Sequence, residues 1–135
     1  MARPTLLVDA GALIALINER DHYHDRVSKV LAGFFGELLT TWPAVTEASH
    51  ILPGHFAPVL LGWLSTPRWR TLGMEGAAPR LREIMLKYAD RPMDLADATM
   101  LWAAEYTGVR QILTTDRTDF EIYRVKTGQR LEILP

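Results

Sequence analysis

The stretch TLLVDAGALIAL, residues 5–16, passes from a short apolar run through an aspartate into a second apolar segment. The run at 5–8 predicts a buried strand, and residues 10–18 predict a helix because their leucine and isoleucine side chains recur at helical spacing. Asp9 stands at the junction. Open α/β sheets form their ligand sites beyond the carboxyl ends of the strands, so Asp9 is placed where such a site would lie.

A similar pattern occurs near the other end of the chain. QILTTD, residues 111–116, is again an apolar run that is followed by an acid, Asp116. We expect each of these two strands to end in its aspartate. Taken singly, either aspartate is better explained as a turn residue or as the N-cap of the next helix, because Asp favours both positions. The two together, with more acids on the helices between them, favour a functional site.

Between these two runs, strand-like and helix-like segments alternate. Further strands are predicted at 37–41, 68–72 and 131–133, with 68–72 at an edge of the sheet. Further helices are predicted at about 21–35, from 42 onward, at 77–88 and at 94–106, with a short turn or helix around 119–123. This alternation favours a parallel sheet covered on both faces. We therefore expect an α/β fold with about five strands, in a single domain over residues 1–135.

The bulk composition argues against several classes of protein. The formal net charge is -1, so the chain lacks the basic excess that is typical of non-specific nucleic-acid binders. There is no cysteine, which excludes a disulfide framework and thiolate chemistry and fits a reducing compartment. No signal peptide fits the N-terminal residues, and no apolar run reaches the ~18 residues of a membrane span. We expect a cytoplasmic protein with no membrane partner.

One long stretch, residues 48–67, contains no Asp, Glu, Lys or Arg. It includes FAPVLLGWL, residues 56–64, which predicts an apolar helix that is either buried or used as a partner interface. Because a domain of this size has limited core for such helices, we expect Leu60 and Trp63 to contribute to an interface.

Five acids stand beside apolar residues at strand ends or in the first half of helices, unlike most of the other acids. They are Asp9, Glu47, Asp94, Asp97 and Asp116. Converging carboxylates raise one another's pKa unless a cation lies among them. Oxygen ligands, without cysteine and without suitably spaced histidines, fit Mg²⁺ or Mn²⁺, and such ions favour phosphodiester hydrolysis. Asp94 and Asp97 also form a capping-box-like pair at the start of a helix.

These acids belong to four short motifs that follow one another along the chain. The motifs are Val8-Asp9, Thr46-Glu47, Asp94-Leu95-Ala96-Asp97-Ala98 and Leu113-Thr114-Thr115-Asp116-Arg117-Thr118-Asp119-Phe120. In this order they resemble the acidic motifs of PIN-domain ribonucleases, and the resemblance covers nearly the whole chain. No single motif is specific, but the ordered set is much more so. The most similar group is the VapC-type toxins of bacterial toxin–antitoxin pairs.

The resemblance implies a PIN-like three-layer fold, with helices on both faces of a central parallel sheet, and an endoribonuclease that cleaves single-stranded RNA. It implies Mg²⁺ or Mn²⁺ as cofactor. By resemblance, Asp9 and Asp97 bind the metal directly, and Glu47 and Asp116 complete the site directly or through water. Asp94 is either a fifth member of the site or only the helix cap, and we favour the cap.

The resemblance also implies partners: RNA as substrate, a small cognate antitoxin protein, and a second copy of the chain in a homodimer. Asp119 is a weaker site candidate, since it is also a candidate cap before Phe120. Ala10 departs from the family, where Ser or Thr often follows the first Asp, and this keeps an inactive PIN-like binding module as an alternative. A PIN-like nuclease in RNA processing is another. A receiver-type domain is disfavoured because no Lys ends the strand before Asp116.

Overall fold

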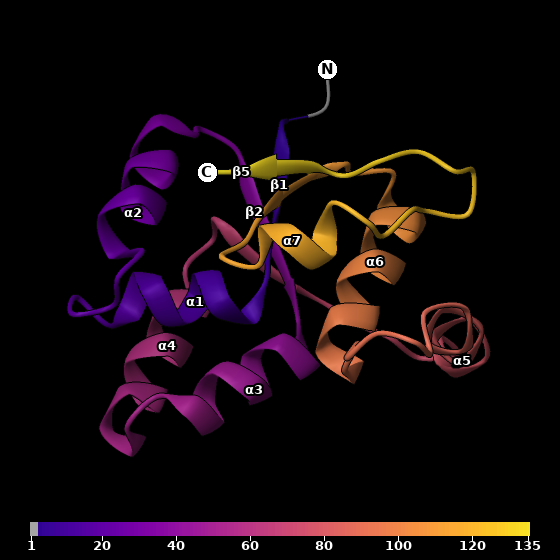
Figure 1. Cartoon of the computed structure of the whole chain (residues 1–135). Helices are drawn as coiled ribbons and strands as arrows, with labels where there is room; N and C mark the ends of the chain where they lie inside the picture. The colour runs from indigo at the N-terminus through magenta and orange to yellow at the C-terminus, as the bar shows by residue number, and fades with distance from the viewer. Residues whose placement is uncertain (1–2) are drawn as a thin grey trace.

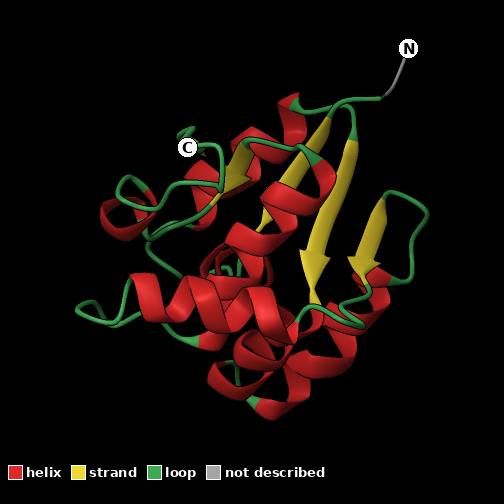
Figure 2. Ribbon diagram, turned by 90° about the vertical axis from the view of Figure 1, so that its right-hand side faces the viewer, coloured by secondary structure: helices red, strands yellow, loops and turns green. Residues whose placement is uncertain are grey.

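Five parallel strands form a single sheet in the computed structural model, which describes residues 3–135; residues 1 and 2 of the predicted domain lie outside the described part (Figures 1 and 2). The strands are β1 (Thr5–Val8), β2 (Glu37–Thr41), β3 (Trp69–Leu72), β4 (Gln111–Leu113) and β5 (Glu132–Leu134). Their order across the sheet is β3-β2-β1-β4-β5. The predicted α/β fold with about five parallel strands is confirmed, and β3 lies at an edge as expected.

Helices cover both faces of this sheet (Figure 1). They are α1 (Ala10–Ile17), α2 (His24–Gly33), α3 (Trp42–Ile51), the 3-10 helix η1 (Gly54–Phe56), α4 (Ala57–Leu64), α5 (Ala78–Lys87), α6 (Leu95–Thr107) and α7 (Arg117–Phe120). Figure 1 shows α1, α2 and α4 gathered on one side, and α5 and α6 on the other. The three layers agree with the expected PIN-like arrangement.

The alternation of side chains along the strands divides the core into two clusters. Leu7 and Ile112 point to the face covered by α5 and α6, and both are fully buried. Leu6 and Leu113 point to the opposite face, where they pack with residues of α1 to α4. Burying a leucine or isoleucine side chain contributes about 1.5–3 kcal/mol to the stability of the fold. Packing against the helices on both faces therefore stabilises these short strands.

The sheet reverses its strand order beside β1, and this reversal positions the site. The chain runs outward from β1 through β2 to β3, and it then crosses to β4 on the other side of β1. Val8 pairs with Leu113 in the register of β1 and β4, so the residues that follow, Asp9 and Thr114, become neighbours. The carboxyl ends of strands at such a reversal are where open α/β sheets bind ligands.

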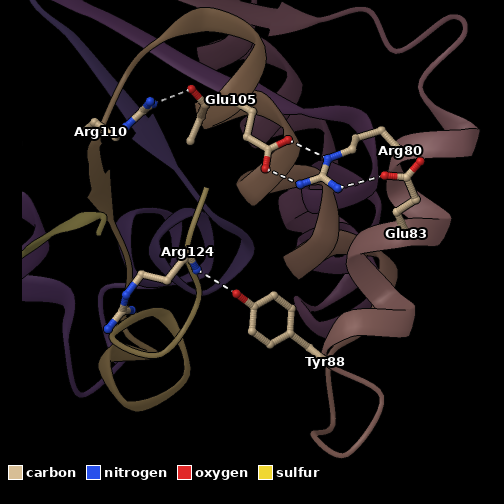
Figure 3. Close-up of polar contacts among 7 residues, drawn as sticks. Arg80, Glu83, Tyr88, Glu105, Arg110 and Arg124 are labelled. Carbon is tan, nitrogen blue, oxygen red and sulfur yellow. Dashed lines mark hydrogen bonds and ion pairs between the residues drawn. The ribbon is translucent and has the colours of Figure 1, made fainter. Parts of the chain in front are cut away.

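Polar contacts tie α6 to its surroundings (Figure 3). The guanidinium of Arg80 donates from Nε and Nη2 to the two carboxylate oxygens of Glu105, at 2.9 and 2.7 Å, and its Nη1 donates to Glu83 at 3.0 Å. The hydroxyl of Tyr88 accepts from the backbone N–H of Arg124 at 2.8 Å. These contacts link α5, α6 and the segment after α7, and α6 is the helix that begins with the predicted acids.

Several element boundaries differ from the predictions by one to three residues, among them those of α2, β3, α7 and β5. The helix predicted from residue 21 begins only at His24, because the Asp21 side chain accepts from the backbone N–H of Tyr23 at 2.8 Å and closes a turn there. The last strand lies one residue later than predicted, at Glu132–Leu134. By contrast, Gly108 ends α6 with a φ of 78°, a left-handed conformation that glycine adopts without strain. Among residues 3–135, none of the helices is long and apolar enough to cross a membrane.

The charge-free stretch is divided between core and surface. Leu60 is 1% exposed and packs in the core, so its predicted place at an interface is wrong. Val59 and Leu61 are each 46% exposed, and Trp63 is 41% exposed. Helix α4 therefore buries Leu60 and leaves large apolar side chains in contact with solvent.

Candidate functional site

Asp9 lies where β1 passes into α1, and the structure shows it as the N-cap of that helix, one residue after the end of the strand. β1 ends at Val8, and Asp9 is the N-cap of α1, where Oδ1 accepts from the backbone N–H of Ala12 at 3.0 Å. Its Oδ2 accepts a hydrogen bond from the hydroxyl of Thr114. Burial raises the pKa of Asp9 to about 6, even though these hydrogen bonds favour the carboxylate.

Thr114 is a site residue that the sequence motifs did not single out. It follows β4, donates to Asp9 and accepts from the backbone N–H of Asp116 at 2.9 Å. The prediction that this strand ends in Asp116 is wrong, because β4 ends at Leu113 and the two threonines form the turn that follows. Asp116 instead caps α7, accepting from the backbone N–H of Asp119 at 3.4 Å. Thr114 could be recognised only from its position opposite Asp9, and that position depends on the order of the strands in the sheet.

Asp94 and Asp97 form the predicted capping box at the start of α6. Oδ1 of Asp94 accepts from the backbone N–H of Asp97 at 2.8 Å, and Oδ2 of Asp97 accepts from the backbone N–H of Asp94 at 3.3 Å. Asp94 is exposed and Asp97 is half-buried. The predicted cap is confirmed, and it fixes the start of the helix that presents both acids.

Glu47 lies on the second turn of α3, and hydrogen bonds hold the start of that helix against α6. Thr41 caps α3, with its hydroxyl accepting from the backbone N–H of Ala44 at 3.4 Å. The same hydroxyl lies 2.7 Å from the hydroxyl of Thr99 on α6, and both threonines are fully buried. The helices that carry Glu47 and Asp97 are therefore held together by a buried contact.

The structure brings the predicted acids together in one pocket of about 270 Å³. Its acidic lining consists of Asp9, Glu47, Asp94, Asp97, Asp116 and Asp119. Gly11 and Thr115 also line it. A side chain at Gly11 would collide with the Thr115 hydroxyl, so the small residue lets α1 approach the turn after β4.

Burial and the neighbouring acids raise the pKa values of several carboxyl groups in the pocket. Burial, then the neighbouring Asp94, raises the pKa of Glu47 to about 7 and that of Asp97 to about 7. Burial also raises the pKa of Asp116. Asp119 lies 3.5 Å from the guanidinium of Arg91. The site thus resists carrying all its negative charges at neutral pH, and a bound cation would relieve that resistance.

The ligand chemistry of the pocket fits a hard divalent cation. All six acidic side chains offer oxygen ligands, which Mg²⁺ and Mn²⁺ prefer. Across residues 3–135, no group of three or more His, Cys, Asp or Glu side chains is already arranged to hold a metal ion. Mg²⁺ commonly binds through only one or two carboxylates and keeps several waters, so a complete cage of protein ligands is not required.

The model of the PIN domain family matches residues 6–126 of the chain, a range that includes all six acids of the pocket. The chain belongs to the PIN domain family. Ribonuclease VapC26 of Mycobacterium tuberculosis is 26% identical to this PIN domain over 136 residues, which cover 96% of this chain and 100% of the relative. The predicted resemblance to PIN domains of the VapC type is thus confirmed.

A solved structure shares the PIN fold at low sequence identity. It is that of Mycobacterium tuberculosis VapC20, described as a sarcin-ricin loop cleaving toxin. The TM-score is 0.80 at 15% identity, and the match covers 96% of this chain and 99% of VapC20. At this identity the likeness shows the fold, and the fold places this PIN domain's acids at the strand-order reversal described above.

Proposed function

We propose that this protein is an endoribonuclease that uses Mg²⁺ or Mn²⁺ to cleave single-stranded RNA. The observation that carries the proposal is the pocket of six carboxylates, in which the pKa values of Asp9, Glu47 and Asp97 are raised to about 6, 7 and 7. Carboxylates in such surroundings remain ionised together when a cation lies among them. The likeness to Ribonuclease VapC26 over nearly the whole of both chains supports the same activity.

The residues that would hold the ion are those of the four motifs. Asp9 and Asp97 would bind it directly, and Glu47 and Asp116 would complete its surroundings directly or through water. When bound, a divalent cation lowers the pKa of a water molecule and neutralises charge on the phosphate. Asp94 contributes chiefly as the cap that orients Asp97.

The chain's own groups position the reactants and move the proton. In hydrolysis the oxygen of water attacks phosphorus, the bond from phosphorus to the leaving ribose oxygen breaks, and that oxygen ends up protonated. Glu47 is half-exposed and lines the pocket, so its carboxylate can accept the proton of the attacking water. Thr114 keeps Asp9 in one orientation.

The proposal extends to biological role: the protein acts in the cytoplasm as the toxin of a toxin–antitoxin pair, as a single PIN-like domain over residues 1–135. Its likeness to VapC26 supports a toxin rather than a nuclease of RNA processing, and a small inhibitor gene beside its own would distinguish the two. An inactive binding module is disfavoured because Thr114 supplies the hydroxyl that Ala10 lacks.

The proposed partners are a second copy of the chain and a small antitoxin protein. The exposed apolar side chains of α4, Val59, Leu61 and Trp63, support this part of the proposal. Val59 and Trp63 line a groove of about 850 Å³ that continues to the end of α1. An amphipathic antitoxin helix binds such a groove through its apolar face.

Cleavage of a short unstructured RNA tests the activity. The purified protein should cut it when Mg²⁺ or Mn²⁺ is present and should stop in excess EDTA. Asp97→Asn should reduce cleavage below detection and reduce the rise in melting temperature that Mn²⁺ causes in the wild type, because a ligand that binds only the native state stabilises it. Asp97→Asn should also stabilise the metal-free protein, since one repelling charge is lost.

Asp90→Asn is the matched control, because Asp90 is exposed and does not line the pocket. It should cut RNA and respond to Mn²⁺ like the wild type. Cleavage that persists in excess chelator would contradict metal dependence. Equal cleavage of a fully paired RNA would contradict the assignment of single-stranded RNA as substrate.

A further inference from the structure

A second hollow, of about 620 Å³, lies directly beside the acidic pocket. We propose that it receives an unpaired base of the RNA, from a nucleotide next to the phosphate that is cleaved. This inference rests on the proposed ribonuclease function and adds to it a site that selects for unpaired RNA. The hollow is formed mainly by the start of α3 and the start of α6, with Met74 from the segment after β3.

The hollow offers a large apolar surface to solvent. Trp42, the first residue of α3, is 52% exposed, and Leu95, the first residue of α6, is 49% exposed. Pro43 and Met74 add further apolar surface. An exposed indole beside aliphatic side chains is the kind of platform on which proteins stack unpaired bases, because every base has an apolar face.

The backbone that carries this platform is fixed. Trp42 follows Thr41, whose hydroxyl caps α3 and contacts Thr99, and the Trp42 carbonyl accepts from the hydroxyl of Thr46 at 2.9 Å. Leu95 follows Asp94, which takes part in the capping box. A ligand that binds here therefore meets a backbone that is already ordered, which lowers the entropy cost of binding.

The hollow and the acidic pocket share a wall. Glu47, Asp94 and Ala96 line both of them. A ligand that occupies both must place an anionic group beside the carboxylates and their cation, and a flat, neutral, largely apolar group beside Trp42. A nucleotide has this chemistry, with its phosphate and its base separated by one sugar. His50 can also hydrogen-bond to the polar edge of a base.

A protein partner fits the second hollow less well than a base does. Two exposed apolar side chains of α4, Val59 and Trp63, line a separate groove, and that groove shares no residue with the hollow. The hollow is instead continuous with the site where the phosphate would be cleaved. In the folded chain, a base beside Trp42 and a protein on α4 would not compete for the same surface.

Binding of a labelled, unstructured RNA in the presence of Mn²⁺ tests the inference. An Asp97→Asn background keeps the RNA intact, and all variants are compared within it. Adding Trp42→Ala should weaken binding roughly 5- to 150-fold, the range expected for loss of one stacked base. Trp42→Phe should keep most of the affinity because it keeps an aromatic face. Tyr106→Ala is the control, because Tyr106 is 69% exposed at the other end of α6.

A series of RNAs, each lacking one base, locates the contact. At one position near the cut, removal of the base should cost as much affinity as Trp42→Ala, and the two changes together should cost no more than either alone. If the Trp42→Ala variant bound every RNA as tightly as the Tyr106→Ala variant, the inference would be overturned. Cleavage of RNA by the wild type would still support the nuclease proposal. If Trp42→Ala left RNA affinity unchanged but abolished the dimer, the hollow would be assigned to a second copy of the chain. A protein that neither binds nor cuts RNA would overturn both proposals.

Discussion

The hydroxyl of Thr114 donates to Oδ2 of Asp9 across the junction between β1 and β4. The hydroxyl oxygen of Thr114 in turn accepts from the backbone N–H of Asp116 at 2.9 Å. The Thr114 side chain thus fixes both Asp9, which follows β1, and the turn that carries Asp116 after β4. It also gives Asp9 a hydroxyl partner although Ala10, the next residue along the chain, has none.

Thr114→Val should remove this contact while preserving the shape of the side chain. We expect a loss of about 1–3 kcal/mol in the free energy of unfolding, because the buried Asp9 oxygen and the Asp116 N–H lose their partner. The pKa of Asp9 should rise further, since the hydrogen bond favours the carboxylate, and the acid limb of RNA cleavage should move to higher pH. Urea unfolding and a pH–rate profile measure the two effects. Thr118→Val, at an exposed position, is the control, and a Thr114→Val protein as stable as that control would contradict the prediction.

Asp9 should make the metal-free protein less stable as the pH rises. Its folded pKa of about 6 lies above the ordinary value of 3.8, so the folded state binds more protons than the unfolded state between these values. Stability from this group is therefore greatest below about pH 4 and falls as the pH rises through 6. The difference of about two pKa units corresponds to about 3 kcal/mol.

Asp9→Asn isolates this effect, because Asn caps a helix about as well as Asp. The gain in unfolding free energy of Asp9→Asn over the wild type, measured in EDTA, should grow between pH 4 and 6 and then level off. Mn²⁺ should stabilise the wild type more than the variant at pH 7. A gain that is constant with pH would show that Asp9 has an ordinary pKa in the folded protein.

Features that depend on neighbouring residues could be predicted from the sequence, and features that depend on strand order could not. The capping box of Asp94 and Asp97 was predicted because its geometry lies within one helical turn. The contact between Thr114 and Asp9 was not, because an apolar run does not specify which strand lies beside it. Leu60 was misplaced because its neighbours in α4 are also apolar, so the spacing does not show which side chain faces the core.

The two roles of Asp94 can be separated by substitution. Asp94→Ser should leave stability and RNA cleavage nearly unchanged, because Ser also caps helices, whereas Asp94→Ala should cost about 0.5–2 kcal/mol of unfolding free energy. Thermal unfolding and cleavage of the same RNA provide the comparison. If Asp94→Ser loses as much activity as Asp97→Asn, Asp94 belongs among the metal ligands.

Substitutions in helix α4 should distinguish effects on assembly from effects on folding. Trp63→Asp places a charge on an exposed position and should weaken self-association or antitoxin binding while the protein still folds and cuts RNA. Leu60→Asp, three residues earlier, should prevent stable folding because it buries a carboxylate without a partner. Sedimentation and circular dichroism distinguish the two outcomes. A Trp63→Asp protein that folds and assembles normally would place the interface elsewhere.

Asp9, Asp94 and Asp116 each line the acidic pocket and each cap a helix. In the genetic code, aspartate and asparagine differ by a single base, and asparagine caps a helix as well as aspartate does. One base change can therefore remove a charge from the pocket and leave the helix start intact. A gene that loses its activity by this route still encodes a folded protein, so it can be inherited as a binding protein without a period in which its product is unstable.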